Sequence, residues 1–577
     1  MRMNAEGTKE WGRITQANVG KHVAVLLDNF VYSYPVVNEA ITGGSSQISG
    51  DFEIDEAKDL ANVLKAGQLP VPARIEGEET VGPTLGEDNI NSGISAFIAA
   101  FILTLIFMAL YYAKSGFVAN VALFANLIFI LGCSAAFTIV LTLPGIAAVV
   151  LTVGMAVDAN VLIFERIREE LKKDKTLKAS IKAGFSNAFS SVMDANITTF
   201  LTGVVLFAFG VGPIKGFAVS LMIGIITSLI SALVITRLIL DYYADKGKDS
   251  MNFGFDWSIA LFDKLKLNMI ARKKTFYMVS MVLIGLSFAS FAINQFKTGV
   301  DFKGGRQFVV EFKDASGNDA DLTSAEVESV RNSLTSAFDN DAPVIKTLSS
   351  NNQLMITTSY LVTDREATTK VTDLMTKNLK ENLKYVPEVI STSDVGPTVA
   401  NDIQTAALKS VIFSLLIIFF YILVRFRKWQ YSAGAIAAVF HDVVIVLGIF
   451  SFLSIFDLPF SVEINQALIA AILTIIGYSI NDTVVVFDRI RENIGEMKAS
   501  KLSNIYNISI DQTISRTLIT SVTTFMTAFI LFMFGGDVIK GFVFAIMIGI
   551  IVGTYSSIFV ASPISLDLIN RTEKEEE

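Results

Sequence analysis

The sequence predicts an α-helical polytopic membrane protein with about eleven transmembrane helices, a parallel pseudo-twofold repeat of its two halves, and small α+β ferredoxin-like domains outside the membrane. Three observations predict this fold class: apolar runs long enough to cross a bilayer, a long motif that occurs twice in the same order, and two polar regions between the apolar runs. Of the 577 residues, 52% are hydrophobic and 18% are charged. Soluble domains carry more charge, about a quarter of their residues on average.

The predicted spans are apolar runs of about 18 residues or more. They lie near residues 91–112, 117–141, 146–164, 195–211, 216–240, 275–294, 404–424, 432–454, 465–487, 517–534 and 541–562. Lys and Arg are concentrated at 165–182, 264–274 and 425–428, whereas the opposite hairpins contain only Lys215 and Lys540. Because cytoplasmic loops carry an excess of Lys and Arg, the basic side is predicted to be cytoplasmic and the polar regions extracytoplasmic.

The two halves repeat each other in sequence. Residues 154–169 (GMAVDANVLIFERIRE) match residues 477–492 (GYSINDTVVVFDRIRE). Shorter matches in the same order pair 81–84 with 395–398, 197–200 with 522–525, and 214–217 with 539–542. A parallel repeat of this kind has its axis along the membrane normal. The arrangement is 5+6, because the span at 275–294 has no counterpart in the first half. We therefore expect a chain cut inside the first soluble domain of a twelve-span protein, unless a separate chain supplies the missing helix.

The polar regions alternate between strand and helix patterns. In the first region, residues 22–29 are predicted to form a strand and residues 55–66 a helix opened by acidic residues. In the second region the predicted order is strand 306–312, helix 323–338, strand 353–359, helix 365–383 and strand 387–393. This order indicates a small α+β domain of ferredoxin-like type.

Composition excludes several classes of function. With 47 Lys and Arg against 55 Asp and Glu, the net charge is −8, which argues against nucleic acid as a partner. The single cysteine, Cys133, excludes an internal disulfide. The two histidines, His22 and His441, are too few for a multi-His metal site. The sequence has no GxxxxGK[ST] motif and no nucleophile with a nearby base. We expect no enzyme activity, no catalytic residues and no cofactor.

Ionisable residues within the apolar spans are the candidate functional site. A charge at the bilayer centre costs about 3 kcal/mol on insertion scales, so such groups usually face a partner or water. Asp158 lies mid-span in the third helix, Asp482 mid-span in the ninth, and Arg516 opens the tenth. Small neighbours would let the two Asp helices meet near the repeat axis. Two carboxylates and one guanidinium do not balance, which favours a proton relay over a fixed ion pair.

Other polar residues in the spans have two interpretations each. Asp442, next to His441 in the eighth span, is either a second step of the proton relay or a polar contact between helices. Asp194 and Asn196 are predicted to cap the fourth span or to line a cavity. Further candidates for cavity lining or helix packing are Asn160, His441, Asn481 and Thr483.

Several charged segments are expected to lie at the membrane surface. The pairs Glu165–Arg166 and Asp488–Arg489 end their predicted spans on the basic side and are interpreted as interfacial anchors. The basic segments 170–190 and 250–270 are predicted to lie on the inner leaflet as amphipathic structures.

Five motifs carry a resemblance to the SecD/SecF family. They are residues 154–160 (GMAVDAN), 29–35 (NFVYSYP) and 43–50 (GGSSQISG), which resemble SecD, and residues 298–305 (TGVDFKGG) and 481–489 (NDTVVVFDR, with HDV at 441–443), which resemble SecF. The match runs over nearly the whole chain and keeps the domain order. The sequence is similar to the fused SecDF form of this family, which belongs to the resistance–nodulation–division (RND) superfamily.

The resemblance implies a multi-pass protein of the bacterial cytoplasmic (inner) membrane with periplasmic domains. It implies an accessory of the Sec translocon that uses the proton motive force to promote export and release of secreted polypeptides. The implied partners are the SecYEG translocon, preproteins driven by SecA, membrane lipid, and YajC and YidC as further candidates. The coupling ion would be H⁺, with Na⁺ as the alternative. Asp158, Asp482 and Arg516 match proton-pathway positions of the family, and Asp442 matches a further polar position.

The resemblance also divides the chain into segments. These are 1–90, the C-terminal part of the first SecD periplasmic domain; 91–240, a SecD-type five-helix bundle; 241–274, a cytoplasmic amphipathic linker; 275–294, the first SecF-type helix; 295–403, the SecF-type periplasmic α+β domain; 404–562, a SecF-type five-helix bundle; and 563–577, an acidic cytoplasmic tail. Most of the first domain, including a mobile head that handles the substrate, is expected to be missing.

Two rival functions remain open on the sequence. One is an RND-type exporter of small molecules or lipids, which would need much larger extracytoplasmic domains than the 110 or so residues at 295–403. The other is a non-transporting scaffold of the translocon, in which the intramembrane charges would be structural.

Overall fold

A computed structural model describes residues 2–27, 30–49, 58, 61, 77–81, 83–139, 142–246, 251–262, 268–294, 296–348, 352–364, 367–456 and 458–576. The chain divides into two compact units, Met1–Ile75 and Glu76–Glu577.

The described residues of the first unit form helix α1 (Ala5–Ala17) and a hairpin of strands β1 (Val25–Leu27) and β2 (Phe30–Ser33). The Asn4 side chain caps α1 by accepting a hydrogen bond from the Gly7 N–H at 2.7 Å. The Trp11 indole donates to Ser46 Oγ at 2.7 Å and fastens the segment after the hairpin to the helix. Strand β1 falls within the predicted strand at 22–29. The predicted helix at 55–66 lies outside the described residues, except for positions 58 and 61.

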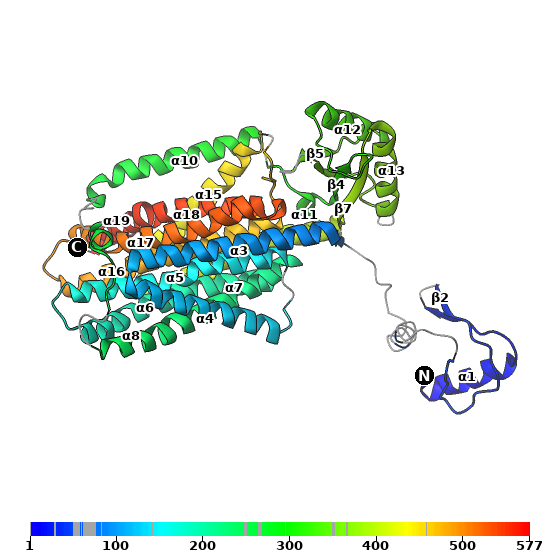
Figure 1. Cartoon of the computed structure of the whole chain (residues 1–577), viewed down its shortest axis with the longest axis horizontal. Coiled ribbons are helices and arrows are strands. Elements are labelled where there is room, and N and C mark those ends of the chain that lie inside the picture. Colours follow the sequence, from blue (N-terminus) through cyan, green and yellow to red (C-terminus); the bar gives the residue numbers. More distant parts are fainter. Residues whose placement is uncertain are drawn as a thin grey trace. The chain divides into compact units, whose positions relative to one another are not determined.

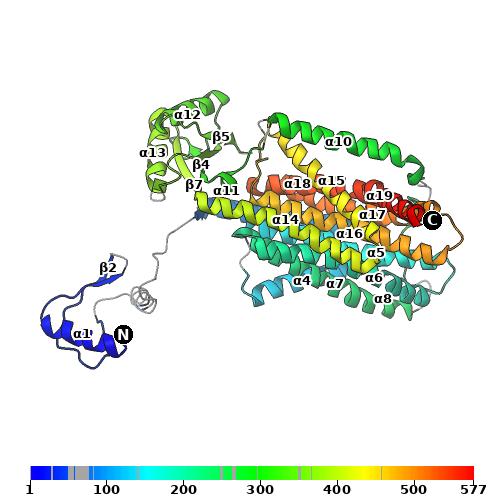
Figure 2. The same cartoon turned by 180° about the vertical axis from the view of Figure 1, so that it is seen from behind.

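The second unit is a bundle of long helices with an α+β domain at one end (Figures 1 and 2). The helices of its first half are α3 (Pro83–Tyr112), α4 (Lys114–Ala136), α5 (Leu143–Leu171), α6 (Leu177–Phe209), α7 (Pro213–Ile230), η1 (Ser231–Ile235), α8 (Thr236–Ala244) and α9 (Asp256–Ala260). Those of its second half are η3 (Met269–Arg272), α10 (Lys273–Asn294), α11 (Val300–Lys303), α12 (Ser324–Ala337), α13 (Ala367–Asn382), α14 (Pro397–Phe426), α15 (Trp429–Leu453), α16 (Gln466–Glu496), α17 (Leu502–Phe534), α18 (Asp537–Ser556), η4 (Ser557–Ala561) and α19 (Ser562–Glu576).

Eleven helices among the described residues are long and apolar enough to span a membrane. This confirms the predicted polytopic helical fold. Two predicted spans begin too late, however. The fourth, predicted at 195–211, belongs to α6, and the tenth, predicted at 517–534, belongs to α17. Neither helix has a proline in its polar first half, so nothing in the chain ends the helix where the apolar run begins. The predicted surface segment at 170–190 is therefore largely the first half of α6.

Helices α5 and α16 form the centre of the bundle. In each, 89% of the apolar window is buried, against 11% in α10, which lies on the outside in both views (Figures 1 and 2). Helix α5 packs on α17 of the other half, and α16 packs on α6 of the other half. The repeated motif therefore forms the two central helices, and each contacts both halves.

The α+β domain has the predicted ferredoxin-like order, and its sheet contains two strands that were not predicted. Its strands are β4 (Gly305–Lys313), β5 (Val344–Thr347), β6 (Gln353–Thr358) and β7 (Val386–Val395), and they alternate with α12 and α13 as βαββαβ. The four-residue strand β5 was not predicted. A fifth strand, β3 (Gly77–Val81), precedes the first span and pairs antiparallel with β7, which gives the sheet order β3-β7-β4-β6-β5.

The domain core is apolar, with one buried cation. Phe308, Val310 and Phe312 of β4 pack with residues of β6 and α13. Arg306 is the second residue of the same strand and is fully buried. Its guanidinium donates to Asp394 Oδ2 at 2.9 Å and to the backbone carbonyls of the 360–364 segment. Arg306 therefore ties β7 and the loop before α13 to the central strand.

A short connection fastens the α+β domain to the N-terminal end of α16. The backbone N–H of Gly299 donates to the Ile464 carbonyl at 2.9 Å, and the N–H of Ile464 donates to the Lys297 carbonyl at 2.8 Å. Asp301 Oδ2 accepts a 2.9 Å hydrogen bond from the backbone N–H of Gln466, the first residue of α16. The Lys346–Glu463 ion pair of 2.7 Å joins strand β5 to the same loop. The start of α16 is thus held by the domain.

Replacing Asp301 by asparagine is expected to change how stability depends on pH. Burial raises the pKa of the Asp301 carboxyl; the Gln466 N–H opposes the rise and Glu463 adds to it. Because the folded pKa lies above the unfolded value of about 4, the stabilisation is present below that value and is lost as pH rises through the folded pKa. In thermal unfolding of the full chain in detergent, the Tm of Asp301→Asn should therefore increase relative to the Tm of wild type as pH rises from about 4.

Asp314→Asn is the matched control, because its pKa shift has the opposite sign and its effect on stability should depend on pH in the opposite direction. The backbone N–H groups of Asn318 and Ser316 lower the pKa of the exposed Asp314 carboxyl. Its stabilisation is present above the ordinary pKa and lost as pH falls through the lowered one, so this variant should lose stability relative to wild type at neutral pH. A Tm difference for Asp301→Asn that does not change with pH would contradict the prediction.

Candidate functional site: a buried carboxylate–guanidinium cluster

The structure brings together the three charged residues that the sequence singled out in the spans. Arg516 Nη1 donates to Asp482 Oδ1 at 2.7 Å, and Arg516 Nη2 donates to Asp158 Oδ1 at 2.5 Å. The three residues come from α17, α16 and α5, so the cluster lies between the halves. We call Asp158, Asp482 and Arg516 the charged triad.

Asn481 adds two hydrogen bonds to the charged triad. Its Nδ2 donates to Asp158 Oδ2 at 2.6 Å, and its Oδ1 accepts from Arg516 Nη2 at 3.2 Å. The repeat pairs Asn481 with Asp158, so the acid of one half is bonded by the amide at the equivalent position of the other. Within the described part of the chain, Asp482 Oδ2 has no hydrogen-bond donor in bonding geometry. This oxygen is a free acceptor inside the protein.

The charged triad is almost closed to solvent and does not balance in charge. The exposed fractions are 9% for Asp158, 1% for Asp482 and 4% for Arg516. With all three groups ionised, two carboxylates and one guanidinium leave one negative charge in excess. A buried unbalanced charge is costly, and binding one proton to a carboxylate removes the imbalance.

Two equivalent glycines let the central helices approach their neighbours in the other half. A Cβ on Gly154 of α5 would lie 2.3 Å from Thr527 Oγ1, and a Cβ on Gly477 of α16 would lie 2.6 Å from Thr202 Oγ1. The glycines are matched by the repeat, and so are the threonines. Small residues at such positions allow close packing of helices in a membrane, which brings the side chains one turn further along into contact.

A second polar cluster lies beside the central helix α16 and includes one of its residues, Ser479. Asp442 of α15 accepts hydrogen bonds from Ser479 Oγ at 2.6 Å and Ser556 Oγ at 2.7 Å, and His441 Nδ1 lies 2.9 Å from its other oxygen. Ser479 precedes Asp482 by three residues on α16. The two acidic clusters are therefore one helical turn apart.

The polar residues predicted to line a cavity or pack between helices make paired contacts near these clusters. Thr483 Oγ1 donates to Ser557 Oγ at 3.0 Å in the second half. In the first half, Asn160 Oδ1 accepts from Thr236 Oγ1 at 2.7 Å. The repeat matches Asn160 with Thr483, and each joins a central helix to the last span of its own half, at Thr236 directly after η1 and at Ser557 in η4.

Comparisons with known proteins identify the family. The model of the SecD/SecF protein export membrane protein C-terminal region matches residues 66–246 and again 375–571. The chain is 35% identical to the protein translocase subunit SecDF of Brucella abortus over 97% of this chain and 71% of that protein. It is 36% identical to SecDF of Thermus thermophilus over 99% of this chain and 74% of that protein.

The chain belongs to the SecD/SecF family. A role in protein export follows from this membership. A crystal structure of Thermus SecDF, described as a translocon-associated membrane protein, matches with a TM-score of 0.81 at 34% identity, over 98% of this chain and 74% of that one. Among relatives that carry one half alone, SecD of Rhodothermus marinus is 57% identical over 44% of this chain and 41% of that protein.

Two further family models match shorter segments. The SecD/SecF GG motif matches residues 289–315, which contain the TGVDFKGG segment. The SecDF P1 head subdomain matches residues 1–71. This second match corrects the expectation that the head is largely missing, because residues 1–71, which include the sequence motifs at 29–50, match the model of the head subdomain.

The structure places Asp194 differently from the prediction. Asp194 lies inside α6, whose N-cap is Thr176, so the prediction of an N-cap at Asp194 is wrong. Arg425 Nε donates to Asp194 Oδ2 at 2.6 Å, and the Tyr421 hydroxyl donates to Oδ1 at 2.8 Å. This SecD/SecF family member therefore joins α6 of its first half to α14 of its second by a buried ion pair. Asn196 bonds its own helix, at the Val192 carbonyl.

The charged ends of the two central helices pair with one another. Asp488 accepts from Ser191 and, at 2.5 Å, from Arg491. Arg166 and Arg489 each bond carboxylates of both central helices. Helices α5 and α16 continue beyond the apolar run, to Leu171 and Glu496. That these residues are interfacial anchors stays a prediction.

Proposed function

We propose that this SecD/SecF family member is an accessory subunit of the Sec translocon. It uses the proton motive force to promote export and release of secreted polypeptides across the bacterial cytoplasmic membrane. The SecYEG translocon and preproteins driven by SecA are its partners in this proposal, with YajC and YidC as further candidates. The α+β domain and the first unit lie on the periplasmic side. The observation that carries the proposal is the charged triad at the seam between the halves.

The triad supports proton coupling through its charge balance. With both carboxylates ionised, Arg516 is shared between Asp158 and Asp482. A proton that binds Asp482 neutralises that carboxylate and leaves Arg516 to pair with Asp158 alone. Because Asp482 and Arg516 belong to the second half and Asp158 to the first, the change weakens a contact within the second half and strengthens the contact across the seam. Asp442, connected to the same helix through Ser479, serves as the next acceptor on the path.

The energy of one proton is large enough to drive such a change. One charge that crosses 100 mV releases about 2.3 kcal/mol. This free energy shifts a two-state equilibrium about fifty-fold, since 1.4 kcal/mol corresponds to a factor of ten. A shift of this size is sufficient to make a minor arrangement of the two halves the dominant one.

Helix α16 connects the charged triad to the periplasmic domain. Asp482 follows Gln466 by 16 residues, a distance of about 24 Å along an α-helix. Gln466 is bonded to Asp301 of the α+β domain, and Glu463 is paired with Lys346. A displacement of α16 at the triad is therefore delivered to the α+β domain without an intervening flexible loop.

The test is substitution of the carboxylates in reconstituted export. Asp158→Asn and Asp482→Asn should each remove the stimulation of preprotein export by an imposed proton gradient and should stop proton uptake by proteoliposomes. Asp194→Asn is the matched control, because Asp194 is also buried and paired with an arginine but does not touch the triad. Export that responds to the gradient equally in both triad variants and wild type would reject the proposal. Uptake of Na⁺ in place of H⁺ would reject the proton as coupling ion.

A further inference from the structure

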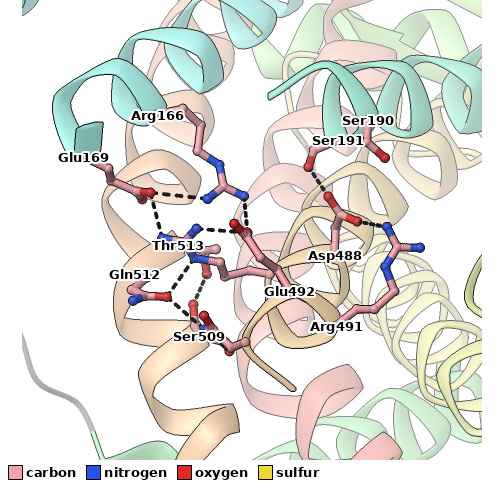
Figure 3. Close-up of polar contacts among 12 residues, drawn as sticks. Arg166, Glu169, Ser190, Ser191, Asp488, Arg491, Glu492, Ser509, Gln512 and Thr513 are labelled. Atoms are coloured by element: carbon pink, nitrogen blue, oxygen red, sulfur yellow. Dashed lines mark hydrogen bonds and ion pairs between the residues drawn. The ribbon is translucent and has the colours of Figure 1, made fainter. Parts of the chain in front are cut away.

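Four charged residues at the ends of the central helices form a closed ring of ion pairs. Arg166 Nη2 pairs with Glu492 at 2.8 Å and Arg489 Nη2 pairs with Glu169 at 2.8 Å, both across the seam. Within each helix, Arg166 pairs with Glu169 at 3.3 Å and Arg489 with Glu492 at 3.0 Å (Figure 3). We call Arg166, Glu169, Arg489 and Glu492 the ion-pair ring.

The ion-pair ring follows the repeat of the chain. The matched motifs pair Arg166 with Arg489 and Glu169 with Glu492. Each helix therefore supplies one cation and one anion, and the ring is neutral, unlike the charged triad. Arg489 is also held by α17, because its Nε donates a 2.7 Å hydrogen bond to Gln512 Oε1.

The ion-pair ring is buried on one side and open on the other. The arginine side chains are 11% and 9% exposed, whereas the glutamates are 30% and 33% exposed. All four residues line a cavity of about 590 Å³ at the basic end of the bundle. Ser515, which precedes Arg516, lines the same cavity. The cavity therefore extends towards the charged triad and meets the ring on the way.

One apolar layer separates the ring from the triad. Arg166 follows Asp158 by eight residues and Arg489 follows Asp482 by seven, so the ring lies about 10–12 Å from the carboxylates along the helices. Leu162 and Val485 lie midway, and both are buried in the same apolar cluster. From the basic side, the order is cavity, ion-pair ring, apolar layer and charged triad. Apolar constrictions of this kind close a water path by dewetting.

We propose that the ion-pair ring is a gate that controls access from the basic side of the membrane to the charged triad. The role of this gate in proton transfer rests on the proposed function, whereas its control of access to the charged triad does not. Separation of α5 from α16 breaks the two pairs across the seam and leaves the two pairs within the helices. Each arginine keeps a carboxylate in both arrangements. The gate therefore opens without leaving an unpaired buried charge, which is the usual penalty for breaking a buried ion pair.

Cysteine accessibility tests the gate without reference to proton transfer. In a Cys133→Ala background, Asn481→Cys places a reporter in the triad, and a small membrane-impermeant thiol reagent is added on the basic side. Arg166→Glu with Arg489→Glu should speed reporter modification about tenfold, which corresponds to about 1.4 kcal/mol. Adding Glu169→Arg and Glu492→Arg inverts the whole ring and should return the rate to the wild-type value.

Lys178→Glu is the control for this experiment, because its 2.7 Å pair with Asp245 is exposed and lies outside the ring. Ser521, a buried residue of α17 five positions after Arg516, provides a second reporter as Ser521→Cys if Asn481→Cys does not fold. Modification rates that are the same in wild type and in the Arg166→Glu/Arg489→Glu variant, with a folded reporter, overturn the gate.

A cross-link separates failure of the gate from failure of proton coupling. Arg166→Cys with Glu492→Cys, joined by a short reducible bifunctional thiol reagent in the Cys133→Ala background, should stop proton uptake into proteoliposomes until the cross-link is reduced. Uptake that continues with the cross-link in place overturns the gate and leaves proton coupling standing. A Cys133→Ala protein that takes up no protons contradicts the proposed function, and the accessibility experiment still decides the gate.

Discussion

Replacing Arg516 by methionine is expected to lower the free energy of unfolding by about 3–5 kcal/mol and to abolish gradient-driven export. The change leaves Asp158 and Asp482 buried and facing each other with no cation, and breaking a buried ion pair by removing one partner costs this much. The measurements are thermal unfolding of the full chain in detergent and export in reconstituted vesicles. Both should fall together in this variant.

A neutral version of the triad separates its structural part from its functional part. Adding Asp158→Asn and Asp482→Asn to Arg516→Met removes every formal charge from the cluster, so most of the lost stability should return. Export driven by a proton gradient should stay absent, because no group in the triad can bind a proton at neutral pH. Recovery of gradient-driven export together with stability would contradict a role for the triad in coupling.

Replacing Arg306 by methionine is expected to destabilise the α+β domain by about 3–5 kcal/mol. The side chain is fully buried, and its loss leaves Asp394 without its cation and removes the guanidinium donors from the backbone carbonyls of the 360–364 segment. Limited proteolysis of the full chain should show cleavage within 296–395 at lower temperature than in wild type.

Arg331→Met is the matched control for Arg306. Arg331 lies on the surface of the same domain and pairs with Glu328 at 3.1 Å. Exposed pairs contribute at most about 1 kcal/mol, so this variant should resist proteolysis almost as wild type does. Equal sensitivity of the two variants would show that the buried network is not what holds the domain.

The sequence was sufficient to predict the charged triad, for a physical reason. Ionisable residues are rare in apolar spans, so Asp158 and Asp482 stand out without any structure. The repeat placed them on equivalent helices, and Arg516 at the start of the tenth span was a candidate cation for the same cavity. What the sequence could not provide was the bonding of Asn481, which depends on the offset of one position between the acids of the two halves.

Other features escaped prediction because they depend on packing between distant helices. The pair of Asp194 with Arg425 joins residues 231 positions apart, and hydropathy placed the start of α6 far beyond its true N-cap. The short strand β5 has only four residues and little pattern. The ion-pair ring did leave a signal, since Arg166 and Arg489 are matched by the repeat. Hydropathy assigned them to the membrane surface because the apolar run ends there.

The strand β3 gives the α+β sheet an attachment to each half of the chain. It leads into α3 of the first half, whereas its neighbour β7 leads into α14 of the second half, and the two strands are hydrogen-bonded along five residue pairs. The sheet therefore cannot pivot on a single tether. A pulling force on this domain is divided between two helices of opposite halves, so mechanical load applied outside the membrane reaches both sides of the seam at once.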